Sequence, residues 1–127
     1  DEFRRMCVLD ALILNVDRHL GNFGVLVDNQ TLEIQRMAPV FDHNRSLLFD
    51  MDQAQLENLP WCIDTCKPRV GTDFVATARG MLTPEICRDV DELREFSFRQ
   101  HSEIRADQAR LDALGAIVRS QAERILE

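Results

Sequence analysis

The stretch NVDRHLGNFG, residues 15–24, lies between two apolar runs and carries four polar side chains: Asp17, Arg18, His19 and Asn22. A connection between two regular elements needs only one or two turn residues, and the two glycines of this stretch meet that need. Four side chains capable of proton transfer, ion pairing or ligand binding are more than a turn requires. The stretch therefore indicates a functional site placed between a helix and a strand.

The segments on either side of this stretch have clear periodicities. Residues 5–15 place Met6, Leu9 and Ile13 on one helical stripe, which predicts a mostly buried helix. Residues 24–28 and 32–37 have the composition of two short strands around an N-Q-T turn, which predicts a small β-hairpin over residues 23–37. The chain then reaches Asp42 directly after an apolar pair.

The second half of the chain is predicted to be mainly helical. Residues 53–72 contain two prolines and a glycine and predict a loop with at most one helical turn. Helices are predicted over residues 73–80 and from Pro84 to about Phe96, with Thr83 as the N-cap of the second. Ser102 is the predicted cap of the last helix. The apolar stripe of this last helix consists of Ile104, Leu111, Leu114, Val118 and Ile125. The predicted fold class is mainly α with one small β-hairpin, in a single domain over residues 1–127.

Composition narrows the class of protein. The chain has 127 residues, 45% hydrophobic and 29% charged, as expected of one soluble globular domain. A net charge of −7 opposes binding to a phosphate backbone, so no direct contact with nucleic acid is expected. The apolar runs are far shorter than the roughly 20 residues that cross a bilayer, so no membrane association is expected. No leader opens the chain, and sequence before Asp1 is expected to have been cut away.

The four cysteines favour a reducing compartment. Cys62 and Cys66 are four positions apart, which is not the two-residue gap of a redox or zinc pair. Cys7 lies among apolar helix residues and is predicted to belong to the core. We therefore expect reduced thiols and a cytoplasmic location.

The spacing of three polar residues predicts a phosphotransfer site. Asp17 and Asn22 are five positions apart, and Asp42 follows Asn22 by twenty positions, across the predicted hairpin. A hairpin returns the end of its second strand beside the start of its first, so Asn22 and Asp42 are expected to lie close together. Their amide and carboxylate oxygens suit Mg²⁺, which keeps a few protein ligands beside water and substrate phosphates. Asp17 is then free to accept a proton.

At this point the sequence resembles a known family. NVDRHLGNFGVL followed by MAPVFDHNRSL resembles the C-terminal lobe of the HipA-like serine/threonine kinases. D-R-H-x-x-N also occurs in the catalytic loop of the more distant phosphoinositide-kinase superfamily. In other protein kinases the catalytic-loop order is H-R-D-x-x-x-x-N, and a metal-binding aspartate follows a short hairpin. The resemblance implies the C-lobe of a protein-kinase-like fold, with catalytic loop 15–24, hairpin 23–37, metal loop 39–47 and helical remainder 73–127.

The resemblance also implies roles for individual residues. Asp17 becomes the catalytic base or hydroxyl-orienting group, and Asn22 and Asp42 become Mg²⁺ ligands that hold the phosphates of ATP. His19 is the alternative proton acceptor, although we favour a role in ordering the loop. Arg18 either pairs with a phosphate or anchors the loop to a carboxylate, and we favour the anchor. The sequence D-H-N departs from the family, because a glycine often follows the metal-binding aspartate; the metal loop is therefore expected to be stiffer.

A complete kinase also needs an N-lobe, with a glycine-rich phosphate loop and a lysine that pairs with the α- and β-phosphates. None of the five glycines forms G-x-G-x-x-G, and the single lysine, Lys67, comes after the catalytic loop. We therefore expect the N-lobe to be absent from this chain and the isolated chain to be inactive. The expected partners are the missing N-lobe and a protein substrate, and a homodimer through the exposed lobe surface stays open.

Two other functions are compatible with the sequence. A metal-dependent phosphohydrolase could use His19, Asp42 and His43, and tight zinc, manganese or iron binding with phosphodiesterase activity would favour it. A non-catalytic interaction module could use the apolar stripe of the last helix to bind a partner helix. Such stripes pack more often on their own domain.

Overall fold

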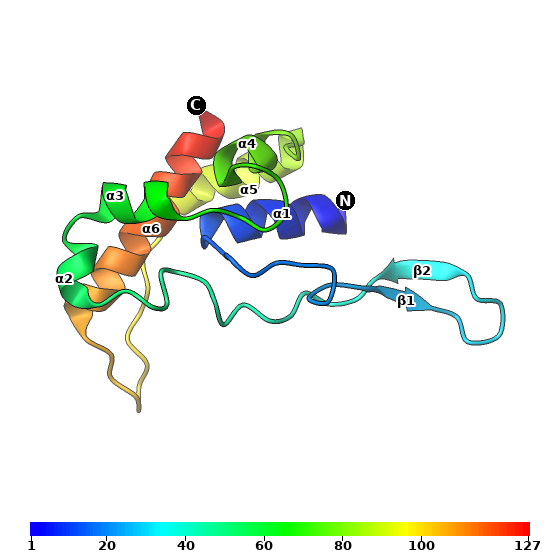
Figure 1. Cartoon of the computed structure of the whole chain (residues 1–127), viewed down its shortest axis with the longest axis horizontal. Coiled ribbons are helices and arrows are strands. Elements are labelled where there is room, and N and C mark those ends of the chain that lie inside the picture. The colour runs from blue at the N-terminus through cyan, green and yellow to red at the C-terminus, as the bar shows by residue number, and fades with distance from the viewer.

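The computed structural model describes all 127 residues, as a mainly helical fold with one two-stranded antiparallel sheet (Figure 1). The order is α1 (Glu2–Leu12), β1 (Val25–Val27), β2 (Ile34–Met37), α2 (Gln53–Leu56), α3 (Leu59–Thr65), α4 (Phe74–Arg79), α5 (Pro84–Glu92), the 3₁₀ turn η1 (Leu93–Glu95) and α6 (Gln108–Leu126). The predicted fold class, mainly α with one small hairpin, is confirmed.

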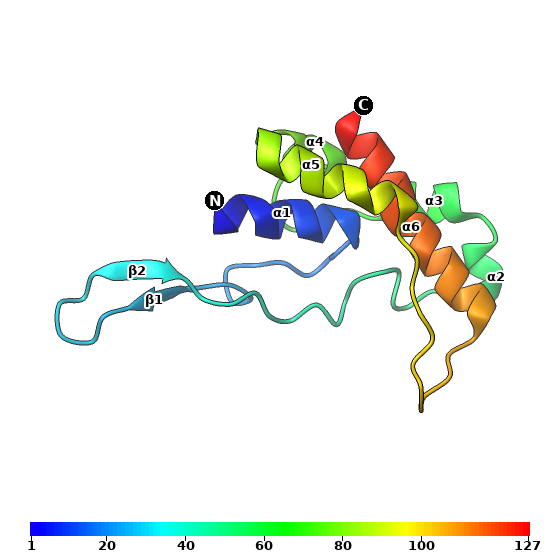
Figure 2. The same ribbon diagram turned by 180° about the vertical axis from the view of Figure 1, so that it is seen from behind.

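The helices form one body around the long helix α6. α6 packs against α1, α4 and α5, and α1 also packs against α4 (Figures 1 and 2). Deeply buried apolar side chains come from α1, α3, α4, α5, α6 and the loop after α1. They include Met6, Leu14, Ile86, Val90, Ile117 and Ile125. No helix combines the length and the apolar character needed to cross a membrane. All four cysteines are free thiols, and burial raises the pKa of the Cys7 thiol within α1.

Side-chain caps determine where several helices begin. The Thr83 hydroxyl accepts a hydrogen bond from the Ile86 N–H at 3.2 Å, and α5 starts at Pro84, so this predicted cap is confirmed. The predicted cap of the last helix is wrong. α6 begins after Asp107, whose carboxylate accepts from the Ala109 N–H at 3.1 Å. Ser102 therefore lies in the preceding loop, and Ile104 is 73% exposed instead of belonging to the stripe.

The prediction of a loop over residues 53–72 is also wrong in its first half, because α2 and α3 lie there. Asp52 and Gln55 form a capping box, in which each side chain bonds the other's backbone N–H at 2.8 and 2.9 Å. Pro60 lies in the first turn of α3, where its missing N–H costs nothing. Both features favour the start of a helix, although a proline further inside a helix disrupts the helix.

The end of α1 leads directly into the site loop. Leu14 has a φ of 51°, the left-handed conformation that usually ends a helix at a glycine. The Asn15 N–H bonds back to the Asp10 carbonyl at 2.9 Å, in the Schellman pattern. The Ala11 carbonyl accepts instead from the side-chain amide of Gln121 on α6, at 2.8 Å. The helix is thus shorter at its end than predicted, since it stops at Leu12.

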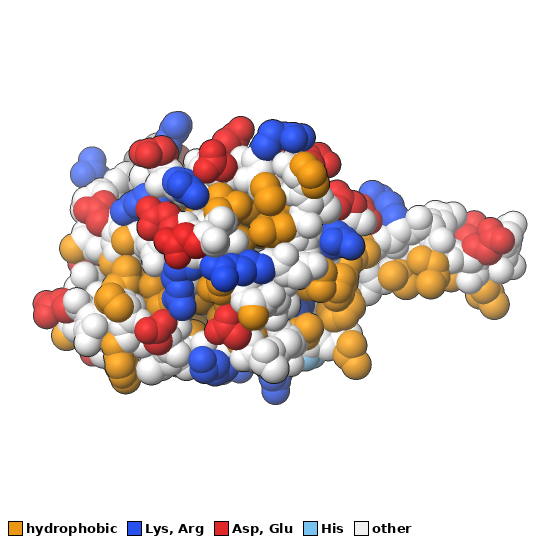
Figure 3. Space-filling view, turned by 90° about the horizontal axis from the view of Figure 1, so that it is seen from above, with side chains coloured by type: hydrophobic (Ala, Val, Ile, Leu, Met, Phe, Trp, Pro, Cys, Tyr) orange, Lys and Arg blue, Asp and Glu red, His pale blue; other side chains and the backbone are white.

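The hairpin β1–β2 is confirmed and protrudes from the helical body (Figures 1 and 3). Val25 pairs with Met37 and Leu26 with Arg36, and the register shifts before Val27. Both strands expose their apolar side chains, which Figure 3 shows along the protruding part. The hairpin therefore contributes little to the core, and its main structural effect is to return the chain from the site loop to residues 38–47.

Candidate functional site

Arg18 is buried and joins three segments of the chain. Its Nε and Nη2 donate to the two carboxylate oxygens of Asp10 on α1, at 2.8 and 2.9 Å. Its Nη1 donates to the backbone carbonyl oxygens of Asn22 and Phe41. The side-chain amide of Asn15 adds a further bond to Asp10 Oδ1, at 2.9 Å. The predicted role of Arg18 as a carboxylate-bound anchor is confirmed.

The Arg18 anchor brings the two flanks of the hairpin together. Because one nitrogen serves both carbonyls, Asn22 before β1 and Phe41 after β2 lie side by side. Asp42 is the next residue, so its backbone lies at the same place. Two further backbone bonds hold the segments side by side in antiparallel directions: Val16 N–H to the Arg45 carbonyl at 3.2 Å and Leu47 N–H to the Ile13 carbonyl. The expected convergence of the site loop with the start of the 39–47 segment is present in the backbone.

Asp17 lies within this arrangement with one carboxylate oxygen engaged. Its backbone N–H donates to Asn15 Oδ1 at 3.1 Å, which fixes the residue to the anchor network. Its Oδ1 pairs with Arg69 at 2.7 Å and with Arg45 at 3.7 Å. Oδ2 accepts no hydrogen bond from the chain. Asp17 thus keeps one free oxygen, which is what acceptance of a proton requires.

Asn22 and Asp42 have the free oxygens that a magnesium site needs. The buried Asn22 donates its side-chain amide N–H to the Asp17 carbonyl at 3.0 Å, which leaves Oδ1 without a partner from the chain. Asp42 is exposed and takes part in no ion pair or hydrogen bond, with a left-handed φ of 58° that aspartate tolerates. An amide oxygen and a free carboxylate are hard donors, so these residues fit Mg²⁺.

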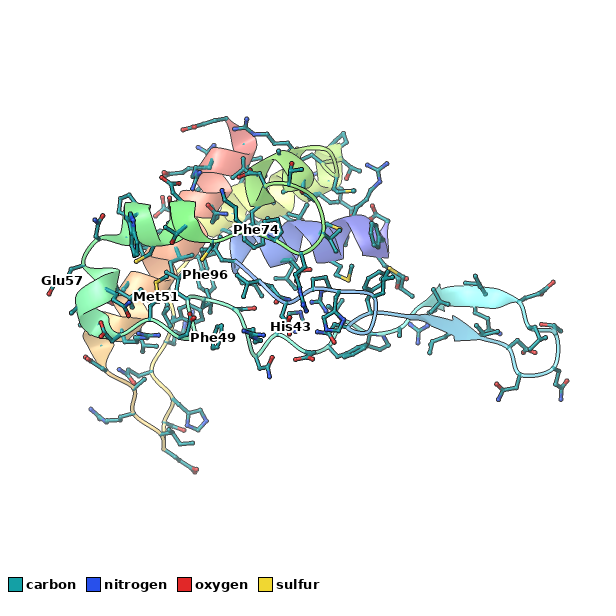
Figure 4. The ribbon with its side chains drawn as sticks, viewed as in Figure 1. His43, Phe49, Met51, Glu57, Phe74 and Phe96 are labelled. Atoms are coloured by element: carbon teal, nitrogen blue, oxygen red, sulfur yellow. The ribbon has the colours of Figure 1, made fainter.

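The histidines do not form a metal cluster. His19 Nδ1 accepts the Gly21 N–H at 3.0 Å, which closes the turn of the site loop and favours the loop-ordering interpretation. His43 lies on the segment below α1, with a buried Nε2 that has no partner (Figure 4). No group of three His, Cys, Asp or Glu side chains is close enough to bind a metal ion. The predicted alternative site of His19, Asp42 and His43 is therefore not assembled.

Arg69 reaches Asp17 from the loop between α3 and α4. Its neighbours Pro68 and Val70 line a small cavity of about 20 Å³ beneath the site loop, together with Asn15 and Arg18. Arg69 and Val70 lie in a bend between α3 and α4, and the Arg69 side chain is 57% exposed. The arginine is therefore positioned by its segment.

Gly71 completes the bend that presents Arg69, and its replacement gives a testable result. Its φ is +83°, and an added Cβ would lie 2.1 Å from the Thr77 hydroxyl oxygen. Gly71→Ala is expected to lower the free energy of unfolding by about 1–3 kcal/mol, measured by urea denaturation. Gly24→Ala is the matched control, since nothing lies within 4 Å of its added Cβ. Equal stability of the two variants would contradict the proposed constraint.

Four residues that build the site were missed in the sequence. Asp10 and Asn15 form the anchor with Arg18, and Arg45 and Arg69 flank Asp17. Asp10 carries a local signal, because it is the one charged residue inside the apolar run VLDALIL. Arg69 carries no such local signal, because it lies 52 positions from its partner Asp17.

Comparison with known proteins adds nothing to this picture: no protein-family model matches the chain, and no curated protein or solved structure is similar to it. The functional assignment therefore depends on the site itself.

Proposed function

We propose that this chain is the C-terminal catalytic lobe of an ATP-dependent phosphotransferase, a HipA-like serine/threonine protein kinase. The observation that supports the proposal best is the Arg18 anchor. One guanidinium nitrogen bonds the carbonyls of Asn22 and Phe41, so the two proposed metal-binding segments meet across the hairpin. Asp17 is tied to the same network through Asn15. Asp17 and Asn22 are thus tied to the anchor by hydrogen bonds, and Asp42 directly follows the anchored carbonyl of Phe41.

In this proposal Asp17 orients the acceptor hydroxyl. The hydroxyl oxygen attacks the γ-phosphorus of ATP, its proton passes to Asp17 Oδ2, and the bond from phosphorus to the β,γ-bridging oxygen breaks to release ADP. Asn22 and Asp42 would hold Mg²⁺, which when bound neutralises and orients the phosphates. The ion pair on Oδ1 leaves Oδ2 as the oxygen that faces the acceptor.

The exposed hairpin suits contact with an N-lobe. An isolated two-stranded hairpin is marginally stable in water, and this one exposes Val25, Val27 and Ile34. An open groove of about 450 Å³ runs beside it, between α1 and residues 36–40. A lobe bearing a glycine-rich loop and a lysine, which this chain lacks, would cover both surfaces and close over ATP.

The proposal is tested with the chain produced together with the N-lobe that the proposal places before Asp1. We expect transfer of ³²P from ATP to protein substrate that requires Mg²⁺ and stops with EDTA. Asp42→Ala is expected to lower the rate at least about a hundredfold, because a charge that stabilises the transferring phosphoryl group is lost. Asp50→Ala is the matched control, since Asp50 is another exposed loop carboxylate.

Two results would contradict the proposal. One is unchanged activity in the Asp42→Ala protein. The other is robust phosphorylation by the isolated 127-residue chain, which has no glycine-rich loop to hold the nucleotide.

A further inference from the structure

We propose that Arg45 and Arg69 form a phosphate-binding subsite on Asp17. This inference deepens the proposed function, on which it depends, by assigning two residues outside the family motif to the same site. Both guanidinium groups contact one oxygen, Asp17 Oδ1, at 3.7 and 2.7 Å. They come from two different segments, residues 39–47 and the loop between α3 and α4.

The two arginines retain most of their hydrogen-bonding capacity. Their side chains are 51% and 57% exposed, whereas the Asp17 side chain is 18% exposed. A guanidinium carries five N–H donors, and Asp17 is the sole ion-pair partner of each. The two guanidinium groups share the single negative charge of Asp17. The surface beside the proposed base is therefore locally positive, although the chain has a net charge of −7.

Both arginines are positioned before any ligand arrives. Arg45 stacks over the Phe49 ring at 5.2 Å, and its carbonyl accepts the Val16 N–H. Figure 4 shows Phe49 on the same segment as His43, below the helical body. Arg69 lies in the bend that Gly71 completes, next to Pro68 and Val70, which line the small cavity under the site loop. Preorganised guanidinium groups lose little side-chain freedom on binding and suit the geometry of phosphate.

The ligand class follows from the position of Asp17. A hydroxyl bound to Oδ2 would attack a phosphorus atom next to the carboxylate, so arginines on Oδ1 lie beside the group being transferred. The charge of that group is spread over three oxygens in the transition state. The same phosphate could come from the γ-position of ATP or from a phosphorylated acceptor.

The test uses the 127-residue chain and inorganic phosphate as the probe, followed by NMR of the arginine side-chain Nε–Hε signals. We expect the Arg45 and Arg69 signals to shift together on titration, and Arg69→Gln to raise the Kd about tenfold, because charge-assisted hydrogen bonds are lost. Arg69→Lys is expected to retain part of the affinity. Arg105→Gln removes the same charge from an exposed loop residue and is expected to change the Kd less than twofold.

Asp17→Asn supplies a second readout that a purely structural ion pair would not give. Removal of the competing carboxylate is expected to tighten phosphate binding several-fold. Unchanged affinity in Arg69→Gln, equal shifts at all arginines, or weaker binding in Asp17→Asn would overturn the subsite.

Two further probes separate the sources of phosphate. Arg69-dependent binding of MgATP assigns the subsite to the nucleotide, and Arg69-dependent binding of a phosphoserine peptide assigns it to the acceptor side. If neither MgATP nor the phosphoserine peptide binds in an Arg69-dependent way, the inference is overturned. If phosphate binds through Arg69 but the protein with its N-lobe transfers no phosphate, the subsite stands and the kinase proposal falls.

Discussion

Asp17→Asn is expected to lower the rate of the proposed phosphotransfer, measured in the chain produced with the proposed N-lobe, by about 10²- to 10⁴-fold, the usual contribution of a general base. The amide keeps the size of the side chain and can still bond Arg69, but it cannot accept the proton of the acceptor hydroxyl. Steady-state rates with MgATP measure the effect, and the KM for ATP is expected to change little.

The His19→Gln variant tests whether Asp17 or His19 accepts the proton of the acceptor hydroxyl. His19 accepts the Gly21 N–H through Nδ1, and the glutamine carbonyl can take over part of that bond. We expect a loss of less than about tenfold, because loop order and not proton transfer is affected. If His19→Gln is as damaging as expected for Asp17→Asn, while Asp17→Asn stays active, histidine is the proton acceptor.

Arg18→Met is expected to destabilise the chain by about 3–5 kcal/mol, the usual cost of leaving a buried charge without its partner. Asp10 and Arg18 have side chains only 8% and 4% exposed, so water cannot replace the lost guanidinium. A domain of this size is stable by about 5–15 kcal/mol, so the variant approaches unfolding. Urea denaturation followed by circular dichroism measures the change.

The double variant Asp10→Leu, Arg18→Met separates stability from site geometry. Replacing both charges with apolar groups removes the buried carboxylate, and we expect most of the lost stability to return. The carbonyls of Asn22 and Phe41 would still lack their common donor. A stable double variant with full phosphotransfer activity would show that the site does not need this anchor.

The site loop and the hairpin could be predicted because their signals are local. The polar cluster, the glycines and the two alternating runs all lie within residues 15–37. Arg18 was predicted as an anchor, and the carboxylate that it binds is Asp10, eight positions away on α1. A charged residue inside an apolar helical run indicates a buried partner of opposite charge, so this pair could have been predicted from the sequence.

The remaining errors come from competing local signals and from distance. Proline and glycine suggested a loop over residues 53–72, but Pro60 lies in a first helical turn, where it is favourable. Ser102 and Asp107 are both good caps, and only packing of α6 against α1, α4 and α5 decides between them. The contacts of Arg45 and Arg69 with Asp17 depend on tertiary structure, so no period or motif reveals them.

The bond between the Gln121 amide and the Ala11 carbonyl joins residues 110 positions apart. During synthesis, α1 leaves the ribosome long before α6 has been made, so the Ala11 carbonyl in its last turn has no Gln121 donor until near the end of translation. Closing so long a segment costs entropy that local contacts do not repay, which slows the final step of folding. The site loop that follows α1 is therefore expected to become ordered only after α6 has docked, and a ribosome-bound chain that ends before Gln121 should still show rapid amide exchange at Asn15.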